Sequence, residues 1–170
     1  MSLDGFIASK NDEIDWLDSI DHGDNDYGYT EFTSNVDTYI VGKRTYDVVM
    51  KLTNGEFPQA EQFDCYVLTR SPKESENGIT FYSGDLKTLI EDFKSKPGKN
   101  IYCDGGGKVV SLFLEHNLID EFIITVFPIL LGDGIRLFPG SSINKISLES
   151  LSTQRYDNGM IQLRYQRIST

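Results

Sequence analysis

The sequence predicts an α/β fold, with a mixed, mainly parallel sheet, flanking helices and an antiparallel C-terminal hairpin. Short apolar runs typical of buried strands alternate with segments in which apolar residues recur at helical spacing. Glycines follow two of these runs directly, as tight strand-to-helix turns require. Near the C-terminus, apolar and polar residues alternate on both sides of Asp157-Asn158-Gly159, which is a hairpin signal.

Composition limits the organisation and the partners of the chain. Its 170 residues suffice for one domain with a real core, and no repeat or linker divides them, so we expect a single domain over 1–170. A formal net charge of −10 argues against a nucleic-acid partner. No apolar run approaches the roughly 18 residues of a membrane span, and no signal layout opens the chain. We therefore expect a cytoplasmic protein without a membrane partner.

Cysteine and histidine usage also favours a cytoplasmic protein, and it argues against a metal site. Cys65 and Cys103 both lie in apolar, strand-like runs, which indicates reduced core thiols. They lack the paired spacing of a zinc site, and the chain has only 2 histidines. We expect no metal site.

The N-terminal part contains a strand, a loop and a helix. The strand, Met1–Ala8, is broken by an Asp-Gly pair, and a central strand would normally begin several residues earlier. The polar segment 9–26 reads as a long surface loop anchored by Trp16, which is either a packing residue or a functional one. A helix is expected from about Asn25 to Asn35.

Three buried strands end in residues that attract anions. The strand 38–41 runs into Gly42-Lys43-Arg44-Thr45 and a helix. The strand 65–69 ends in Arg70-Ser71, and the strand from Ile101 opens into three glycines before a helix of about 109–116. Each junction alone is as compatible with a plain connection as with a ligand site.

The remaining elements complete the expected fold. We expect a short strand at 79–82, a helix at 85–96 and a strongly apolar strand at 119–127. A Gly-Asp-Gly turn within 129–138 should lie against the sheet edge, ahead of the final hairpin. Because strand 119–127 and segment 129–138 carry more apolar surface than one sheet needs, a homodimer through this edge is a further hypothesis.

Carboxyl ends of parallel strands gather at one edge of a sheet, where ligands bind. Three anion-seeking strand ends match the phosphates of a dinucleotide with an additional 2′-phosphate, so NADPH is the expected cofactor. The fingerprints of a Rossmann domain and of a P-loop are both absent. The predicted cofactor-binding residues are Gly42, Lys43, Arg44, Thr45, Thr69, Arg70, Ser71, Gly105, Gly106, Gly107, Lys108 and Val109.

The chain resembles the dihydrofolate reductase-like superfamily, and within it the reductase domain of bacterial riboflavin biosynthesis and its stand-alone relatives. The matching pieces follow the family's order along nearly the whole chain. They are Ser2 to Ala8, Val41 to Tyr46, Leu68 to Ser71, the triplet Gly105 to Gly107, and Pro128 to Gly134 with Leu137-Phe138.

The resemblance implies a three-layer dihydrofolate reductase-like fold and roles for individual residues. The glycine triplet would lie against the pyrophosphate of NADPH, and Arg70 would meet the 2′-phosphate. Trp16 falls where dihydrofolate reductases keep a loop tryptophan beside the nicotinamide, and we assign it with Gly132 and Asp133 to the substrate.

The sequence also departs from the family. Dihydrofolate reductase has one acid on the helix before the second strand, and neither Asp26 nor Glu31 matches it cleanly. No zinc deaminase pattern and no ribose-phosphate clamp is present. We expect an NADPH-dependent reductase of the riboflavin-biosynthesis type that transfers hydride to a C=N or C=O carbon, with Asp4, Asp26 and Glu31 as candidate acids. Dihydrofolate reductase and a catalytically silent dinucleotide-binding protein are the alternatives.

Overall fold

A computed structural model describes residues 1–140 and 145–168 of the chain. They divide into two compact units, here called the middle unit (25–109) and the terminal unit (1–24 with 110–170). The expectation of one domain over 1–170 stays a prediction. Among the described residues, no helix is long and apolar enough to cross a membrane, and no group of His, Cys, Asp and Glu could hold a metal ion. Both cysteines are free thiols.

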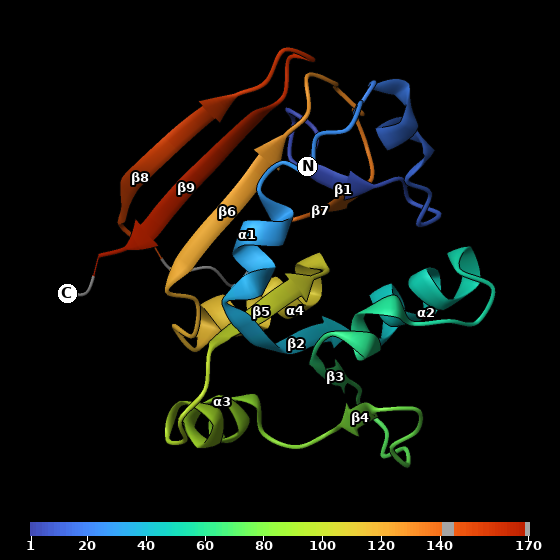
Figure 1. Ribbon diagram of the computed structural model, residues 1–170, viewed down its shortest axis with the longest axis vertical. Coiled ribbons are helices and arrows are strands. Elements are labelled where there is room, and N and C mark those ends of the chain that lie inside the picture. Colours follow the sequence, from blue (N-terminus) through green and yellow to red (C-terminus); the bar gives the residue numbers. More distant parts are fainter. Residues whose placement is uncertain (141–144, 169–170) are drawn as a thin grey trace. The chain divides into compact units, whose positions relative to one another are not determined.

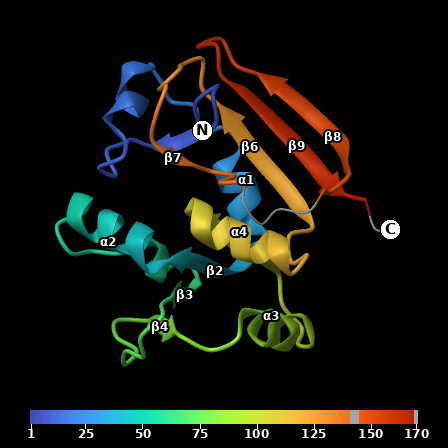
Figure 2. The same cartoon turned by 180° about the vertical axis from the view of Figure 1, so that it is seen from behind.

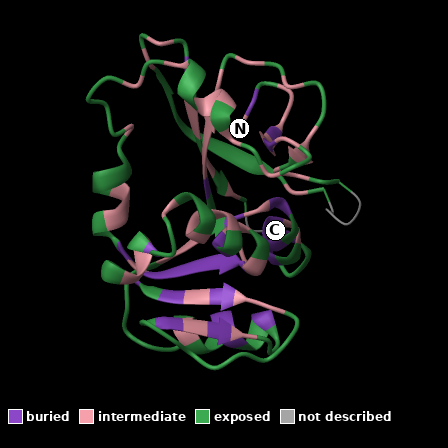
Figure 3. Cartoon of the chain, turned by 90° about the vertical axis from the view of Figure 1, so that its right-hand side faces the viewer, coloured by how far each residue is buried: buried purple, intermediate pink, exposed green. Residues whose placement is uncertain are grey.

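The middle unit is built on a parallel sheet of four strands in the order β4-β3-β2-β5 (Figure 1). The strands are β2 (Val36–Gly42), β3 (Asp64–Leu68), β4 (Ile79–Tyr82) and β5 (Asn100–Gly105). β2 lies between β3 and β5 and is apolar along nearly its whole length. Buried residues dominate it, as the burial colours of Figure 3 show, because parallel strands are covered on both faces.

Alternation along β2 sends its side chains to two cores. Tyr39 and Val41 face a cluster that α1 (Tyr29–Ser34), α2 (Lys43–Leu52) and the 3-10 helix η2 (Pro58–Glu61) cover. Ile40 points to the opposite face and is fully buried. Against that face packs α3 (Leu86–Lys94), whose Phe93 ring meets Tyr66 of β3 at 4.9 Å. The middle unit therefore has three layers. Figure 2 shows the opposite side of the molecule, where α3 is labelled.

The terminal unit contains the rest of the sheet structure. β6 (Glu121–Val126), β9 (Ile161–Arg167) and β8 (Leu148–Arg155) form an antiparallel sheet in the order β6-β9-β8. β1 (Phe6–Ala8) pairs antiparallel with β7 (Ile135–Arg136), and the 3-10 helix η1 (Asp15–Ser19) follows β1. Helix α4 (Gly107–Glu115) crosses the boundary between the units, so its first residues belong to the middle unit.

The predicted α/β class, the parallel sheet and the antiparallel C-terminal hairpin are confirmed. Backbone pairing, however, divides the strands into three sheets, and the expected loop at 129–138 contains the short strand β7. The first helix is shorter than expected because Tyr27 and Gly28 have positive φ angles, so that it begins only at Tyr29.

Candidate functional site

Three strand ends of the middle unit lie side by side at the carboxyl edge of its sheet. Gly42, the last residue of β2, is paired with Leu68, the last residue of β3. On the other side of β2, Val41 is paired with Gly105, the last residue of β5. The segments that follow these strands are those predicted to bind the phosphates, so one edge brings them together.

Helix α2 starts directly at the end of β2. Its N-cap residue, Gly42, has no side chain to accept a hydrogen bond from the first turn, and this turn contains no acidic residue. Such a helix start offers its amides and its positive dipole end to an anion. A Cβ added at Gly42 would lie 2.8 Å from Cγ2 of Val109, so only glycine lets α2 and α4 start this close together.

The glycine triplet is fastened to the first turn of α2. The amide of Gly106 donates to the hydroxyl oxygen of Thr45 over 3.1 Å. Gly105 has a φ of 105°, which favours glycine, and the Gly105–Gly106 peptide bond is cis. Helix α4 begins at Gly107, and Lys108 is exposed beside its start. Two helix starts and a glycine turn thus form one hydrogen-bonded assembly.

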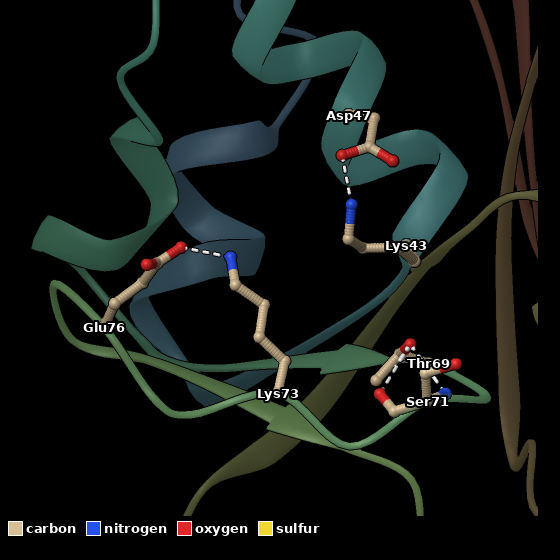
Figure 4. Close-up of polar contacts among 6 residues, drawn as sticks. All are labelled: Lys43, Asp47, Thr69, Ser71, Lys73 and Glu76. Atoms are coloured by element: carbon tan, nitrogen blue, oxygen red, sulfur yellow. Dashed lines mark hydrogen bonds and ion pairs between the residues drawn. The ribbon is translucent and has the colours of Figure 1, made fainter.

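The segment after β3 is a tight turn that contains Thr69 and Ser71 (Figure 4). The amide of Ser71 donates to the hydroxyl oxygen of Thr69 over 3.2 Å, and the Thr69 amide donates to the carbonyl of Tyr82 over 2.9 Å. These bonds fix the turn against β4. Arg70 is exposed at its tip.

Two lysines near this edge have acidic partners (Figure 4). Lys43 lies 2.5 Å from Oδ1 of Asp47, one turn further along α2. Lys73 pairs with Glu76, and its ammonium lies 4.0 Å from the centroid of the Phe81 ring. An anion at the start of α2 would therefore compete with Asp47 for Lys43.

Two predicted acids lie in the middle unit, on or just before α1. The Asp26 carboxylate accepts hydrogen bonds from the amides of Gly28 (2.9 Å) and Thr30 (3.1 Å). The Thr30 hydroxyl and these amides lower the pKa of Asp26, so it is ionised at neutral pH. Its contacts are those of a residue that fixes a helix start. Glu31 is exposed in the first turn of α1.

Asp4 lies in the terminal unit and is tied down by three donors. Its carboxylate accepts from the Ser2 hydroxyl at 2.7 Å and from the amides of Gly132 and Leu131 at 2.7 and 3.1 Å. The hydroxyl and the amides lower the pKa of Asp4 to about 2. The carboxylate thus joins the segment before β1 to the turn before β7. These are the contacts of a residue that stabilises the fold.

The residues assigned to the substrate also lie in the terminal unit. The ring of Trp16 meets Phe127 edge-on at 5.3 Å, and its Nε1 is buried without a hydrogen-bond partner among the described residues. Asp133 forms an ion pair with Lys10, which lowers the pKa of this carboxyl. Gly132 has a φ of 76° and forms the turn held by Asp4.

Sequence reasoning missed a carboxylate at the carboxyl end of β5. Asp104 directly precedes the glycine triplet, and two phenols donate to it. The Tyr102 hydroxyl donates to Oδ1 over 2.6 Å, and the Tyr39 hydroxyl donates to Oδ2. Tyr39 and Tyr102 are paired in the β2–β5 register, so only a correct alignment of these two strands would have brought both phenols to Asp104.

The environment of these phenols keeps them protonated. Tyr39 is 1% exposed, and Tyr102 packs edge-on against it and against Phe32. Burial, followed by the charge of Asp104, raises the pKa of both tyrosines. The same two causes raise the pKa of Tyr29 at the start of α1. All three hydroxyls therefore remain donors at physiological pH.

Comparison with known proteins shows the family of the chain. Residues 1–162 match the family described as the RibD C-terminal domain. The chain is 39% identical, over 98% of its length and 94% of the relative's, to the uncharacterized protein YwjB of Bacillus subtilis (strain 168). It shares 32% identity and a TM-score of 0.89 with a Shewanella sp. PV-4 protein provisionally named as a riboflavin biosynthesis protein, over 99% and 96% of the two chains.

More distant structures share the fold. A Thermotoga maritima diaminohydroxyphosphoribosylaminopyrimidine deaminase/5-amino-6-(5-phosphoribosylamino)uracil reductase matches with a TM-score of 0.71 and 17% identity, over 99% of this chain and 54% of that one. Dihydrofolate reductase from Enterococcus faecalis, in complex with NADP(H), matches with a TM-score of 0.67 and 16% identity, over 99% and 93%. The fold is therefore dihydrofolate reductase-like.

Proposed function

Because the chain belongs to the RibD C-terminal domain family, we propose that it is an NADPH-dependent reductase of the riboflavin-biosynthesis type. Its reaction resembles the reduction of 5-amino-6-(5-phosphoribosylamino)uracil, with hydride transfer to a C=N or C=O carbon of a small heterocyclic metabolite. The observation that carries the proposal is the row of anion-attracting segments after β2, β3 and β5 at one sheet edge.

The chemistry of this edge fits a phosphorylated dinucleotide. The uncapped start of α2 and the glycine triplet offer backbone amides without a Cβ in the way, which suits a pyrophosphate. Arg70, on the fixed turn after β3, suits the 2′-phosphate, because a guanidinium binds phosphate oxygens in pairs. Lys43, Arg44, Thr45, Lys108 and the residues around them complete the proposed cofactor site.

When bound, NADPH supplies the hydride, and the protein contributes binding, orientation and the exclusion of water. A proton must reach the heteroatom of the reduced bond. Asp4 and Asp26 are poor donors since hydrogen bonds hold both as carboxylates. We therefore assign proton return to Glu31, the candidate acid whose carboxylate is exposed, with solvent water as the alternative source.

Titration of the protein with NADPH, followed by nicotinamide fluorescence, tests the proposal directly. We expect saturable binding at micromolar concentrations, and weaker binding of NADH because it lacks the 2′-phosphate. NADPH oxidation on addition of a ribosylaminopyrimidine would then establish turnover. The absence of saturable NADPH binding would contradict the proposal that the protein is an NADPH-dependent reductase.

A second candidate is a dinucleotide-binding protein without turnover. The observation that favours it is the engagement of Asp4 and Asp26 in hydrogen bonds of their own backbone surroundings. This candidate predicts the same NADPH affinity but no oxidation with aminopyrimidine, pterin or carbonyl substrates. Dihydrofolate reductase proper would be recognised by nanomolar competition from methotrexate, which we do not expect.

We propose further that the protein is cytoplasmic and forms a homodimer. Leu130, in the segment predicted to form the dimer contact, is 70% exposed, which leaves apolar surface to cover. Sedimentation at tens of micromolar protein tests the assembly, and a clean monomer would remove the dimer from the proposal.

A further inference from the structure

Asn-Gly pairs are places where the backbone of a protein can modify one of its own side chains. The amide nitrogen of the glycine attacks Cγ of the asparagine, and this nitrogen is easily reached because glycine has no Cβ to shield it. The chain contains three such pairs, Asn54-Gly55, Asn77-Gly78 and Asn158-Gly159. All three lie at turns between helices or strands, so their reactivity depends on what the fold does with each glycine amide.

The Asn54-Gly55 pair is held by the end of α2. The amide of Gly55 donates to the carbonyl of Met50 over 2.7 Å, in the pattern of a Schellman cap. This nitrogen can attack Cγ of Asn54 only after the hydrogen bond has been given up. The reactive arrangement of this pair is therefore less populated.

The Asn158-Gly159 pair is held through both of its residues. The amide of Gly159 donates to the carbonyl of Tyr156 over 3.0 Å. The Asn158 side chain donates from Nδ2 to the carbonyl of Asp21 over 3.0 Å, and its Oδ1 accepts from the amide of Met160 at 3.2 Å. Nucleophile and target are thus both fixed in other contacts.

The Asn77-Gly78 pair has no such protection. Its residues are the centre of a two-residue turn, closed by backbone hydrogen bonds of 3.0 and 2.8 Å between Glu76 and Ile79. Their φ angles of 50° and 78° are those that a two-residue hairpin turn requires of Asn-Gly, and both residues are exposed. Within residues 25–109, all of which the structure describes, neither the Asn77 side chain nor the Gly78 amide forms a hydrogen bond.

The surroundings of this turn leave room for the reaction. A Cβ built at Gly78 has one neighbour within 4 Å beyond the adjoining residues, the carbonyl oxygen of Ala60 at 3.9 Å. Only one bridged residue pair, Glu76 with Ile79, closes the turn, and so short a hairpin opens locally at low cost. Asn77 can therefore rotate until its Cγ meets the Gly78 nitrogen.

We propose that Asn77 is a site of spontaneous deamidation in the folded protein. The Gly78 nitrogen forms a bond to Cγ of Asn77, the bond from Cγ to Nδ2 breaks, and Nδ2 leaves as ammonia with the proton released by the Gly78 amide. Water then opens the cyclic imide at either carbonyl and gives aspartate or isoaspartate. No oxidant, metal or cofactor takes part, so the reaction is independent of the proposed function.

The conversion changes both the charge and the backbone of the turn. A carboxylate replaces a neutral amide directly beside Glu76, which already forms an ion pair with Lys73 (Figure 4). Isoaspartate also adds one atom to the backbone, so the turn no longer has the two-residue geometry that sets the register of Glu76 and Ile79.

Peptide mapping by mass spectrometry of protein aged in mildly alkaline buffer tests the proposal. The three pairs serve as one another's controls in a single sample. In the folded protein, we expect the converted fraction at Asn77 to exceed those at Asn54 and Asn158 by at least about 5-fold, the factor that one hydrogen bond is worth. In urea, the three rates should come within about 3-fold of one another, because the same dipeptide then has no fixed contacts.

Two variants provide a second measurement, the release of ammonia from the folded protein. N77D should lose most of the release. N54D is the matched control, since Asn54 also has a positive φ, of 55°, that aspartate tolerates, and it should release ammonia nearly as the wild type does. Equal conversion at the three sites of the folded protein, or conversion of Asn77 only in urea, would overturn the proposal. An equal loss of ammonia release in N77D and N54D would overturn it as well.

Discussion

The amide of Gly106 and the hydroxyl of Thr45, 61 residues apart along the chain, are joined by a hydrogen bond of 3.1 Å. This bond links the glycine triplet after β5 to the first turn of α2. It thereby ties together two of the three segments that we assign to the cofactor phosphates. Loss of this hydrogen bond should therefore weaken the binding of the cofactor phosphates.

T45V should weaken NADPH binding. Valine keeps the shape of the side chain but leaves the part-buried Gly106 amide without its acceptor, which costs on the order of 1 kcal/mol. We expect lower stability in urea and a higher Kd for NADPH. T45S, which keeps the hydroxyl, is the control and should resemble the wild type. Unchanged NADPH affinity in T45V would separate the glycine turn from the cofactor.

R70A should reduce the preference for NADPH over NADH. The guanidinium lies at the tip of the turn fixed by Thr69 and Ser71, and its loss removes charge-assisted hydrogen bonds of about 1.5–3 kcal/mol. The Kd for NADPH should rise about 10- to 100-fold. NADH binding should stay nearly constant.

Fluorescence titration with both cofactors makes this measurement. R155A, in β8, removes the same formal charge elsewhere and should leave both affinities unchanged. A uniform loss of NADPH and NADH affinity in R70A would assign Arg70 to a different phosphate.

G42A should destabilise the protein by overpacking. Gly42 has a φ of −79°, which alanine adopts freely, so the effect arises from the added Cβ at 2.8 Å from Val109. Overpacking of this kind costs about 1–3 kcal/mol. The double variant G42A/V109A should recover part of the loss, a non-additivity measured by urea unfolding. Simple additivity would show that the clash is relieved by backbone movement instead.

D4N should lower stability in a pH-dependent way. Folding lowers the pKa of Asp4 from 3.8 to about 2, so its stabilising contribution is complete above the unfolded value and is lost as pH falls through about 2. The gap in unfolding midpoint between wild type and D4N should therefore be widest above pH 5 and narrow toward pH 2.

Thermal unfolding at several pH values tests this behaviour. E149Q is the control, since it removes an exposed carboxylate of β8 and none of the hydrogen bonds to Leu131 and Gly132. A gap between wild type and D4N that stays constant down to pH 2 would contradict the assigned role of these hydrogen bonds.

Periodicity and glycine placement sufficed to predict the elements that position the phosphate site. The run Tyr39 to Val41 is apolar and Thr38 before it is buried, which marks a strand covered on both faces, and Gly42 marks its turn into α2. Parallel pairing could be predicted because parallel strands need long crossovers, and the helices α2 and α3 supply them. The strand order β4-β3-β2-β5 was not predicted, since it depends on contacts distant in sequence.

The roles of the carboxylates could not be read from the sequence. Asp4 and Asp26 were predicted as candidate acids from their place in the chain, but hydrogen bonds to amides distant or local in sequence determine their charge state. Asp104 was passed over because its environment comes from Tyr39, which lies 65 residues earlier. A propensity scale contains no information on such a contact.

All residues assigned to the phosphates of the cofactor belong to one unbroken stretch of chain, the middle unit of residues 25–109. We therefore expect recognition of the cofactor phosphates to be encoded in a continuous block of the gene rather than scattered over its whole length. A mutational survey would sort its variants accordingly, with direct losses of nucleotide affinity confined to this block.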